Sequence, residues 1–209
     1  MRFSPFLIIV FSVFSLFGYR ECLNRDEITE NCLSEIFIAE DYYSFIRYSD
    51  SSEYDDAEKK LIQKAFAFYK LGRYEEFDSL LEKSSNNLKN TLFFKHLRLE
   101  TYFVRKRFTQ ALDILNDIKD NSPVFFVEQN LFCMEADIMH SRKQYDEAVT
   151  LYETCVENGK NPIASYRRLV SMEKNGIPRA VYISEYLEYA ETYRFSFLSD
   201  KILDRLVYL

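Results

Sequence analysis

The sequence predicts an all-α protein made of paired helices. Of its 209 residues, 47% are hydrophobic and 17% are aromatic, so the chain can build a core and is not disordered. It contains only four Gly and four Pro, too few for the tight turns of a many-stranded sandwich or the phosphate loops of a nucleotide-binding sheet. A helical sequence pattern also occurs three times, and its first two copies are 34 residues apart. Successive helix pairs account for all three observations.

Residues 1–18 have the pattern of a signal peptide, because Arg2 precedes an apolar run that ends at the small residue Gly18. The run is shorter than the roughly 20 residues that span a bilayer, so we expect cleavage after Gly18 rather than a retained anchor. A lipoprotein processed at Cys22 is the alternative, although Glu21 stands where a small residue is usual. We therefore expect an exported protein, in the periplasm or cell envelope if bacterial and secreted otherwise. It would meet a membrane only through a lipid at Cys22 or an uncleaved signal.

Four cysteines, an even number, suit disulfides in an exported protein, because the compartments outside the cytosol are oxidising. Four cysteines allow three pairings. We favour the local pairing, Cys22 with Cys32 and Cys133 with Cys155, the second across a predicted helical hairpin. Four unpaired thiols are the alternative.

Three turns, each followed by an aromatic residue, mark the repeat. Tyr74 in KLGRYEEFDSLLEK and Phe108 in VRKRFTQALDILNDI lie 34 residues apart, and Tyr145 in SRKQYDEAVTLYETC follows after 37. The three additional residues are expected in the turn KDNSPV, between Lys119 and Val124. Residues three and seven positions after the aromatic residue share one helix face: Phe77 and Leu81, Ala111 and Leu115, and Ala148 and Tyr152.

An amphipathic stretch precedes each turn, so each copy is expected to contain two helices. Small residues there let two helix backbones approach closely. The apolar positions are Leu61, Ala65 and Phe68 in the first copy, Leu99 and Tyr102 in the second, and Phe132, Ala136 and Met139 in the third.

This pattern resembles the tetratricopeptide repeat family over about residues 57–162, best in YEEF, FTQAL and YDEAV, with Pro123 and Pro162 ending two copies. The resemblance implies a right-handed α-solenoid of helical hairpins, with atypical helices capping both ends. The chain departs from the family pattern at first-helix positions usually held by large apolar residues: Lys64, Lys95, Arg98 and Glu135.

The segment 19–56 is expected to form the N-terminal cap. Leu33 to Tyr48 predicts one helix. Ser49 to Asp56 predicts a polar linker whose Asp residues cap the next helix.

The segment 163–209 is expected to form the C-terminal cap. ASYRRLVSMEKNG and IPRAVYISEYLEYAETY predict a fourth, degenerate hairpin, in which Gly176 ends the first helix and Pro178 opens the second. A last helix, Ser199 to Val207, is expected to seal the end.

The sequence predicts no catalytic, cofactor or metal site. The motifs GxxxxGK[ST], GxGxxG, GxSxG and HExxH are missing from it. Neither His96 nor His140 has a second His or Cys three or four residues away, and Cys133 lies two helical turns from His140. The net charge of −6 argues against a nucleic-acid partner, which needs a basic stripe.

The resemblance implies that first-helix residues line a concave groove that holds a protein or peptide partner. Aromatic side chains would hold apolar anchors there, and Lys59 and Lys70 would pair with a carboxylate. The expected groove residues are Lys59, Ile62, Phe66, Tyr69, Lys70, Phe93, His96, Glu100, Phe103, Asn130, Asp137 and His140.

The function predicted from these observations is that of an exported, non-catalytic adaptor or scaffold. The alternative is a lipid-anchored or soluble structural subunit of a cell-envelope assembly. Such a subunit would pack through exposed aromatic residues near the C-terminus: Tyr186, Tyr189, Tyr193 and Phe195.

Overall fold

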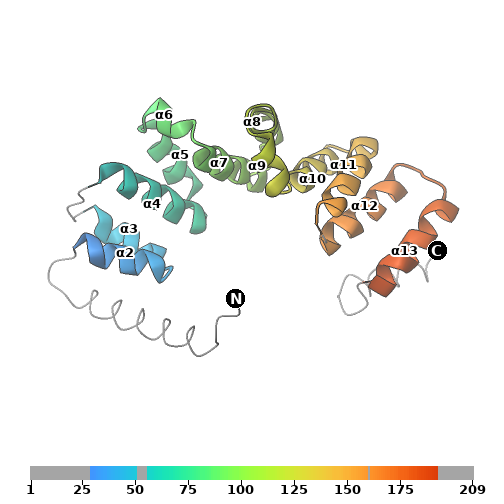
Figure 1. The fold of residues 1–209 in the computed structure, drawn as a ribbon, viewed down its shortest axis with the longest axis horizontal. Coiled ribbons are helices and arrows are strands. Elements are labelled where there is room, and N and C mark those ends of the chain that lie inside the picture. Colours follow the sequence, from blue (N-terminus) through green and yellow to red (C-terminus); the bar gives the residue numbers. More distant parts are fainter. Residues whose placement is uncertain (1–28, 51–55, 160, 193–209) are drawn as a thin grey trace. The chain divides into compact units, whose positions relative to one another are not determined.

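The computed structural model describes residues 29–50, 56–159 and 161–192, and every regular element in these ranges is a helix (Figure 1). The all-α prediction is therefore confirmed for this part of the chain. The signal peptide and the predicted helix Ser199 to Val207 lie outside the described residues. The helices are α2 (Glu30–Ile38), α3 (Tyr42–Ser49), α4 (Ala57–Lys70), α5 (Tyr74–Glu82), α6 (Asn86–Lys89), α7 (Leu92–Val104), α8 (Phe108–Asn121), α9 (Pro123–Glu128), α10 (Phe132–Ser141), α11 (Tyr145–Glu157), α12 (Pro162–Lys174) and α13 (Arg179–Thr192).

The chain divides into two compact units, and the division falls inside α7, between Leu97 and Arg98. We call the part up to Leu97 unit 1 and the part from Arg98 unit 2. Each is described by itself.

One left-handed turn joins the two helices of each predicted hairpin. Gly72, Lys106 and Lys143 have φ of 68°, 57° and 64°. In each turn the next N–H donates to the carbonyl five residues earlier, at 2.8 to 2.9 Å, which is the Schellman arrangement that ends a helix. The predicted aromatic residue comes two positions after the left-handed one and opens the second helix. The three predicted hairpin turns are thus confirmed.

A fourth copy of this turn lies near the N-terminus, where we had predicted one helix from Leu33 to Tyr48. That prediction is wrong, because Glu40 has φ of 60° and separates α2 from α3. Asp41 caps α3 by accepting a hydrogen bond from the Ser44 N–H at 3.1 Å. The physical reason is burial: in an unbroken helix Ile36 and Phe45, nine residues apart, would point in opposite directions. The turn lets both enter one core at 0% exposure.

The four hairpins bury the same positions relative to the aromatic residue at the turn. Nine positions before it stand Leu33, Ala65, Leu99 and Ala136, each 0% exposed. Three positions after it stand Phe45, Phe77, Ala111 and Ala148, also at 0%. The chain therefore repeats one packing register from α2 to α11, one hairpin more than the sequence pattern predicted.

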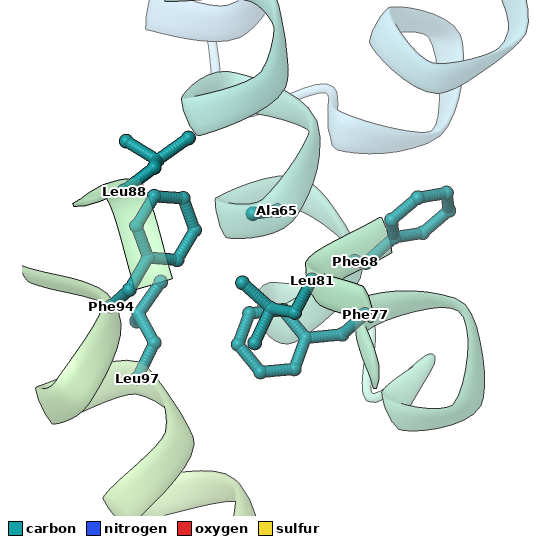
Figure 2. Packing of buried hydrophobic residues seen from close by; sticks show 7 residues of the cluster. All are labelled: Ala65, Phe68, Phe77, Leu81, Leu88, Phe94 and Leu97. Carbon is teal, nitrogen blue, oxygen red and sulfur yellow. The ribbon is translucent and has the colours of Figure 1, made fainter. Parts of the chain in front are cut away.

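The core of unit 1 forms where α4, α5, α6 and α7 meet. Figure 2 shows Phe77 and Leu81 of α5 in one cluster with Ala65 of α4 and with Phe94 and Leu97 of α7. The predicted cap at the start of α4 is confirmed, because Asp56 accepts hydrogen bonds from the N–H groups of Glu58 and Lys59. Residues 51–55 of the predicted linker lie outside the described residues.

Between its second and third hairpins the chain departs from the repeat, and the sequence analysis placed this departure at the wrong residues. The additional residues between the second and third copies do not form a loop at KDNSPV, because α8 continues to Asn121 and Pro123 opens α9. Proline fits the first helical position, since its missing N–H would be unpaired there in any case. The break comes instead at Asn130, whose φ of 47° separates α9 from α10.

The C-terminal hairpin α12–α13 keeps the pattern of buried positions in its first helix but not in its second helix. Gly176 has φ of 75° and follows α12, as predicted, while α13 begins at Arg179, one residue after Pro178. Tyr186 and Tyr189 are 0% and 4% exposed, so the prediction that they are surface residues is wrong. Their spacing of three places both on the face of α13 that packs against α12. Tyr193 and Phe195 lie outside the described residues.

Candidate partner-binding surface

The predicted groove residues, Lys70 apart, occupy four equivalent positions, 13, 10, 6 and 3 residues before the left-handed residue of a turn. These spacings place them on one face of each first helix. They are Lys59, Ile62, Phe66 and Tyr69 on α4, Phe93, His96, Glu100 and Phe103 on α7, and Asn130, Asp137 and His140 at or on α10. The boundary between the units divides this set, so that the residues up to His96 belong to unit 1 and the later ones to unit 2.

Unit 1 carries a row of aromatic rings across three successive first helices. We call Phe37 of α2, Phe66 of α4 and Phe93 of α7 the aromatic ladder. The ring centroids of Phe37 and Phe66 are 5.8 Å apart, and those of Phe66 and Phe93 are 6.4 Å apart with an interplanar angle of 27°. Tyr42 and Tyr69 flank Phe66 at 5.8 and 6.3 Å. Phe93 is 41% exposed, so the ladder reaches solvent.

Phe37 and Tyr42 were missed by the sequence analysis because it merged α2 and α3. A signal for them does exist in the sequence. Tyr42 lies 32 residues before Tyr74, and a buried aromatic residue follows each of them after three positions. In the same register Phe37 corresponds to Tyr69.

The two lysines expected to meet a partner's carboxylate differ in their surroundings. Lys59 Nζ lies 2.7 Å from Glu30 Oε1, so a carboxylate of α2 already pairs with it. Lys70 is exposed, and its Nζ lies 5.1 Å from the ring centroid of Phe66 and 6.0 Å from that of Tyr69. A cation at this distance is attracted by the ring faces. Lys70 makes no ion pair with a described residue.

In unit 2, Asp137 links three helices. Its Oδ1 accepts a hydrogen bond from the Tyr152 hydroxyl of α11 at 2.6 Å, and its Oδ2 pairs with the Arg167 guanidinium of α12. Burial, and then the Asp137 carboxylate, raise the pKa of Tyr152 far above its ordinary value. The hydroxyl therefore stays protonated and remains a donor. Asp137 therefore holds α10, α11 and α12 together.

His140 makes a second link between α10 and α12. Its Nδ1 lies 2.7 Å from Ser171 Oγ, and Ser171 donates its only hydroxyl hydrogen to the Arg167 carbonyl. We therefore assign the ring hydrogen to Nδ1. Burial, followed by the positive charge of Arg167, lowers the pKa of His140 below the ordinary 6.5, which Asp137 partly offsets.

The predicted disulfide between Cys133 and Cys155 is confirmed. It joins α10 to α11 with a Cα–Cα distance of 5.0 Å. Asn130 Nδ2 donates to the Cys155 carbonyl at 2.7 Å, so this predicted groove residue also braces the hairpin. Cys32 is buried and disulfide-bonded, and its predicted partner Cys22 lies outside the described residues.

Two other predicted groove residues lie against neighbouring side chains. Ile62 packs on the core of unit 1, and the ring of Phe103 lies 6.4 Å from that of Phe108 in unit 2. His96 and Glu100 are half-buried on α7.

A cavity of about 360 Å³ in unit 2 is lined by α11, α12 and α13 around Arg168. The Arg168 guanidinium pairs with Glu153, at 2.6 Å, and with Glu185. These pairs tie three helices together and leave the charge of Arg168 compensated. Within the described ranges, no three His, Cys, Asp or Glu side chains gather closely enough to hold a metal ion. No described helix is long and apolar enough to cross a membrane.

Comparison of the chain with protein-family models, with curated proteins and with solved structures found no significant match.

Proposed function

We propose that the protein is an exported, non-catalytic adaptor of the tetratricopeptide type that binds a protein or peptide through the first-helix face of unit 1. One observation carries the proposal: Phe66 and Phe93, from successive first helices, stack at 6.4 Å while Phe93 stays 41% exposed. Exposed aromatic faces held on rigid helices cost little side-chain entropy when they are covered. That makes them suitable anchors for a partner.

The repeated hairpin register supports a solenoid of stacked hairpins, because one packing register recurs at four turns. In such an array the first helices share a face. The corresponding face of unit 2 is polar and already hydrogen-bonded through Asp137 and His140. We therefore place the anchor site in unit 1.

Site-specific photo-crosslinking in the native host tests the proposal. A photoreactive phenylalanine analogue replaces Phe93 in one variant and Val181, a 52% exposed residue of α13, in the matched control. We expect a defined adduct, identified by mass spectrometry, from position 93 and none from position 181. Equal adducts at both positions, or none at position 93, would contradict the proposal.

Export is part of the proposal and is tested by intact mass after cell fractionation. A mass that begins at Tyr19 supports a cleaved signal peptide, whereas one that begins at Cys22 with added acyl chains indicates a lipoprotein. A full-length mass would overturn the export prediction.

A structural subunit remains the second candidate, although through a different surface from the one predicted. The helix α13 exposes Val181, Ile183 and Leu187 at 52%, 39% and 51%, and the spacing of four places Ile183 and Leu187 on one side of it, away from Val181. Adjacent exposed aliphatic side chains on one helix favour a contact with another protein. Co-purification in a constant ratio, abolished by Leu187→Ser but not by Phe93→Ser, would favour this candidate over the adaptor.

A further inference from the structure

We propose that the aromatic ladder selects segments in which an aromatic or large aliphatic side chain lies close to an acidic residue. This inference rests on the proposed function and adds the chemistry of the partner. It is carried by the position of Lys70 over the rings.

The apolar half of the preference comes from the ladder itself. Phe37, Phe66 and Phe93 provide adjoining rings from three helices, and Phe93 is the most exposed. Covering such rings removes apolar area from water, at roughly 25 cal/mol per Å². A polar segment would gain nothing from this contact.

The acidic half comes from the charge of Lys70. On α4, Lys59 pairs with Glu30 and Lys64 with Asp50, whose Oδ1 lies 2.6 Å from Lys64 Nζ. Lys70, by contrast, makes no ion pair with a described residue, and its ammonium lies above Phe66 and Tyr69.

A partner that covers Phe66 must therefore also cover part of the Lys70 ammonium. Removing an ammonium group from water without a counter-charge is costly, and a partner carboxylate offsets the cost. A basic segment would add repulsion, so the ladder discriminates against it.

The orientation of the segment also follows. Glu40, in the turn between α2 and α3, is exposed and acts electrostatically on Tyr42. A partner carboxylate is therefore disfavoured beside Tyr42 and favoured beside Lys70. We expect the apolar side chain on the ladder and the acidic residue at its Lys70 side.

Selection of a random twelve-residue peptide library displayed on phage tests the inference on purified protein. The same library is selected in parallel on three variants of the protein: Lys70→Glu, Phe93→Ser and, as a matched exposed apolar control in unit 2, Leu187→Ser. Circular dichroism confirms that each variant is folded. The best wild-type peptide is then synthesised, and its affinity is measured by fluorescence polarisation at low and high salt.

We expect wild type and Leu187→Ser to enrich the same acidic, apolar peptides. Lys70→Glu should reverse the charge preference and lower the affinity for the best wild-type peptide by roughly fivefold, with a smaller loss of affinity at high salt. Apolar peptides that depend on Phe93 but show no acidic preference would overturn this inference and leave the proposed function standing. Identical peptides from wild type and Phe93→Ser would overturn both.

Discussion

The ring of Phe37 lies 5.8 Å from the ring of Phe66 and joins the first helices of two successive hairpins. This contact brings α2 into the same aromatic row as α4 and α7. It is possible only because the chain turns at Glu40 and does not continue as one helix.

Replacing Phe37 by Ala should destabilise the N-terminal hairpin by about 2 kcal/mol, because its ring contacts Tyr42, Phe45 and Phe66. The neighbouring Ile38 is 66% exposed, so Ile38→Ala should cost under about 0.5 kcal/mol. Hydrogen exchange of peptides from α2 and α3 measures both changes. Equal protection in the two variants would show that the Phe37 contact adds no stability.

Asp137 and Tyr152 should behave as a coupled pair. Tyr152→Phe removes the donor to Asp137 and should cost about 1 to 2 kcal/mol. Tyr166→Phe is the matched control, since no hydrogen bond of the Tyr166 hydroxyl occurs within the described part of the chain. A double-mutant cycle of Asp137→Ala with Tyr152→Phe, followed by denaturant unfolding, gives the coupling free energy. Additive losses would show that the Asp137–Tyr152 hydrogen bond adds no coupling between α10 and α11.

Acid should weaken unit 2 through His140. Because folding lowers the pKa of His140, its stabilising contribution is present above the ordinary 6.5 and is lost as pH falls through the lowered value. The groups that face it are Arg167, Asp137, Lys174 and the two tyrosines Tyr145 and Tyr152. NMR titration of the His140 ring should give a midpoint below 6.5, and His140→Gln should remove part of the acid sensitivity. A midpoint at or above 6.5 would refute this prediction.

The left-handed lysines offer a stabilising change. Lys106 and Lys143 have φ of 57° and 64°, which costs a residue with a Cβ about 1 to 2 kcal/mol relative to glycine. Lys106→Gly and Lys143→Gly should each raise the free energy of unfolding by about 1 kcal/mol. Asn116→Gly, on the exposed side of α8, should lower it by about 0.3 kcal/mol, because glycine is a poorer helix former than asparagine. Denaturant unfolding compares the signs, and a loss of stability in either lysine variant would rule out strain at that turn.

Removal of the Cys133–Cys155 disulfide should destabilise unit 2 by about 3 kcal/mol, because it closes a loop with a sequence separation of 22. The double variant Cys133→Ala/Cys155→Ala tests this without exposing a thiol. Hydrogen exchange should increase in α10 and α11, with α4 and α5 of unit 1 as the internal control. Unchanged exchange in α10 would contradict a stabilising role.

Of the candidate site, the sequence pattern predicted Phe66, Tyr69, Lys70 and Phe93 but not Phe37. Phe66, Tyr69 and Phe93 follow from the repeat spacing, since one register assigns them to the same helix face, whereas Lys70 follows from its place beside Tyr69 at the end of the same helix. Phe37 required the turn at Glu40, whose residue type does not indicate a turn, so that only the spacing of 32 residues between Tyr42 and Tyr74 could have indicated it.

The sequence alone determined the helical class and the turns at Gly72, Lys106 and Lys143, and it favoured the disulfide between α10 and α11, because each depends on spacing along the chain. Tertiary structure decided where α2 ends, whether Tyr186 is buried and which polar groups bond to Asp137. Spacing assigns a residue to a face of its own helix, whereas only the packing of a second helix decides whether that face is covered. For this reason the repeat register could be derived from the sequence, and the division between an exposed aromatic face in unit 1 and a bonded polar face in unit 2 could not.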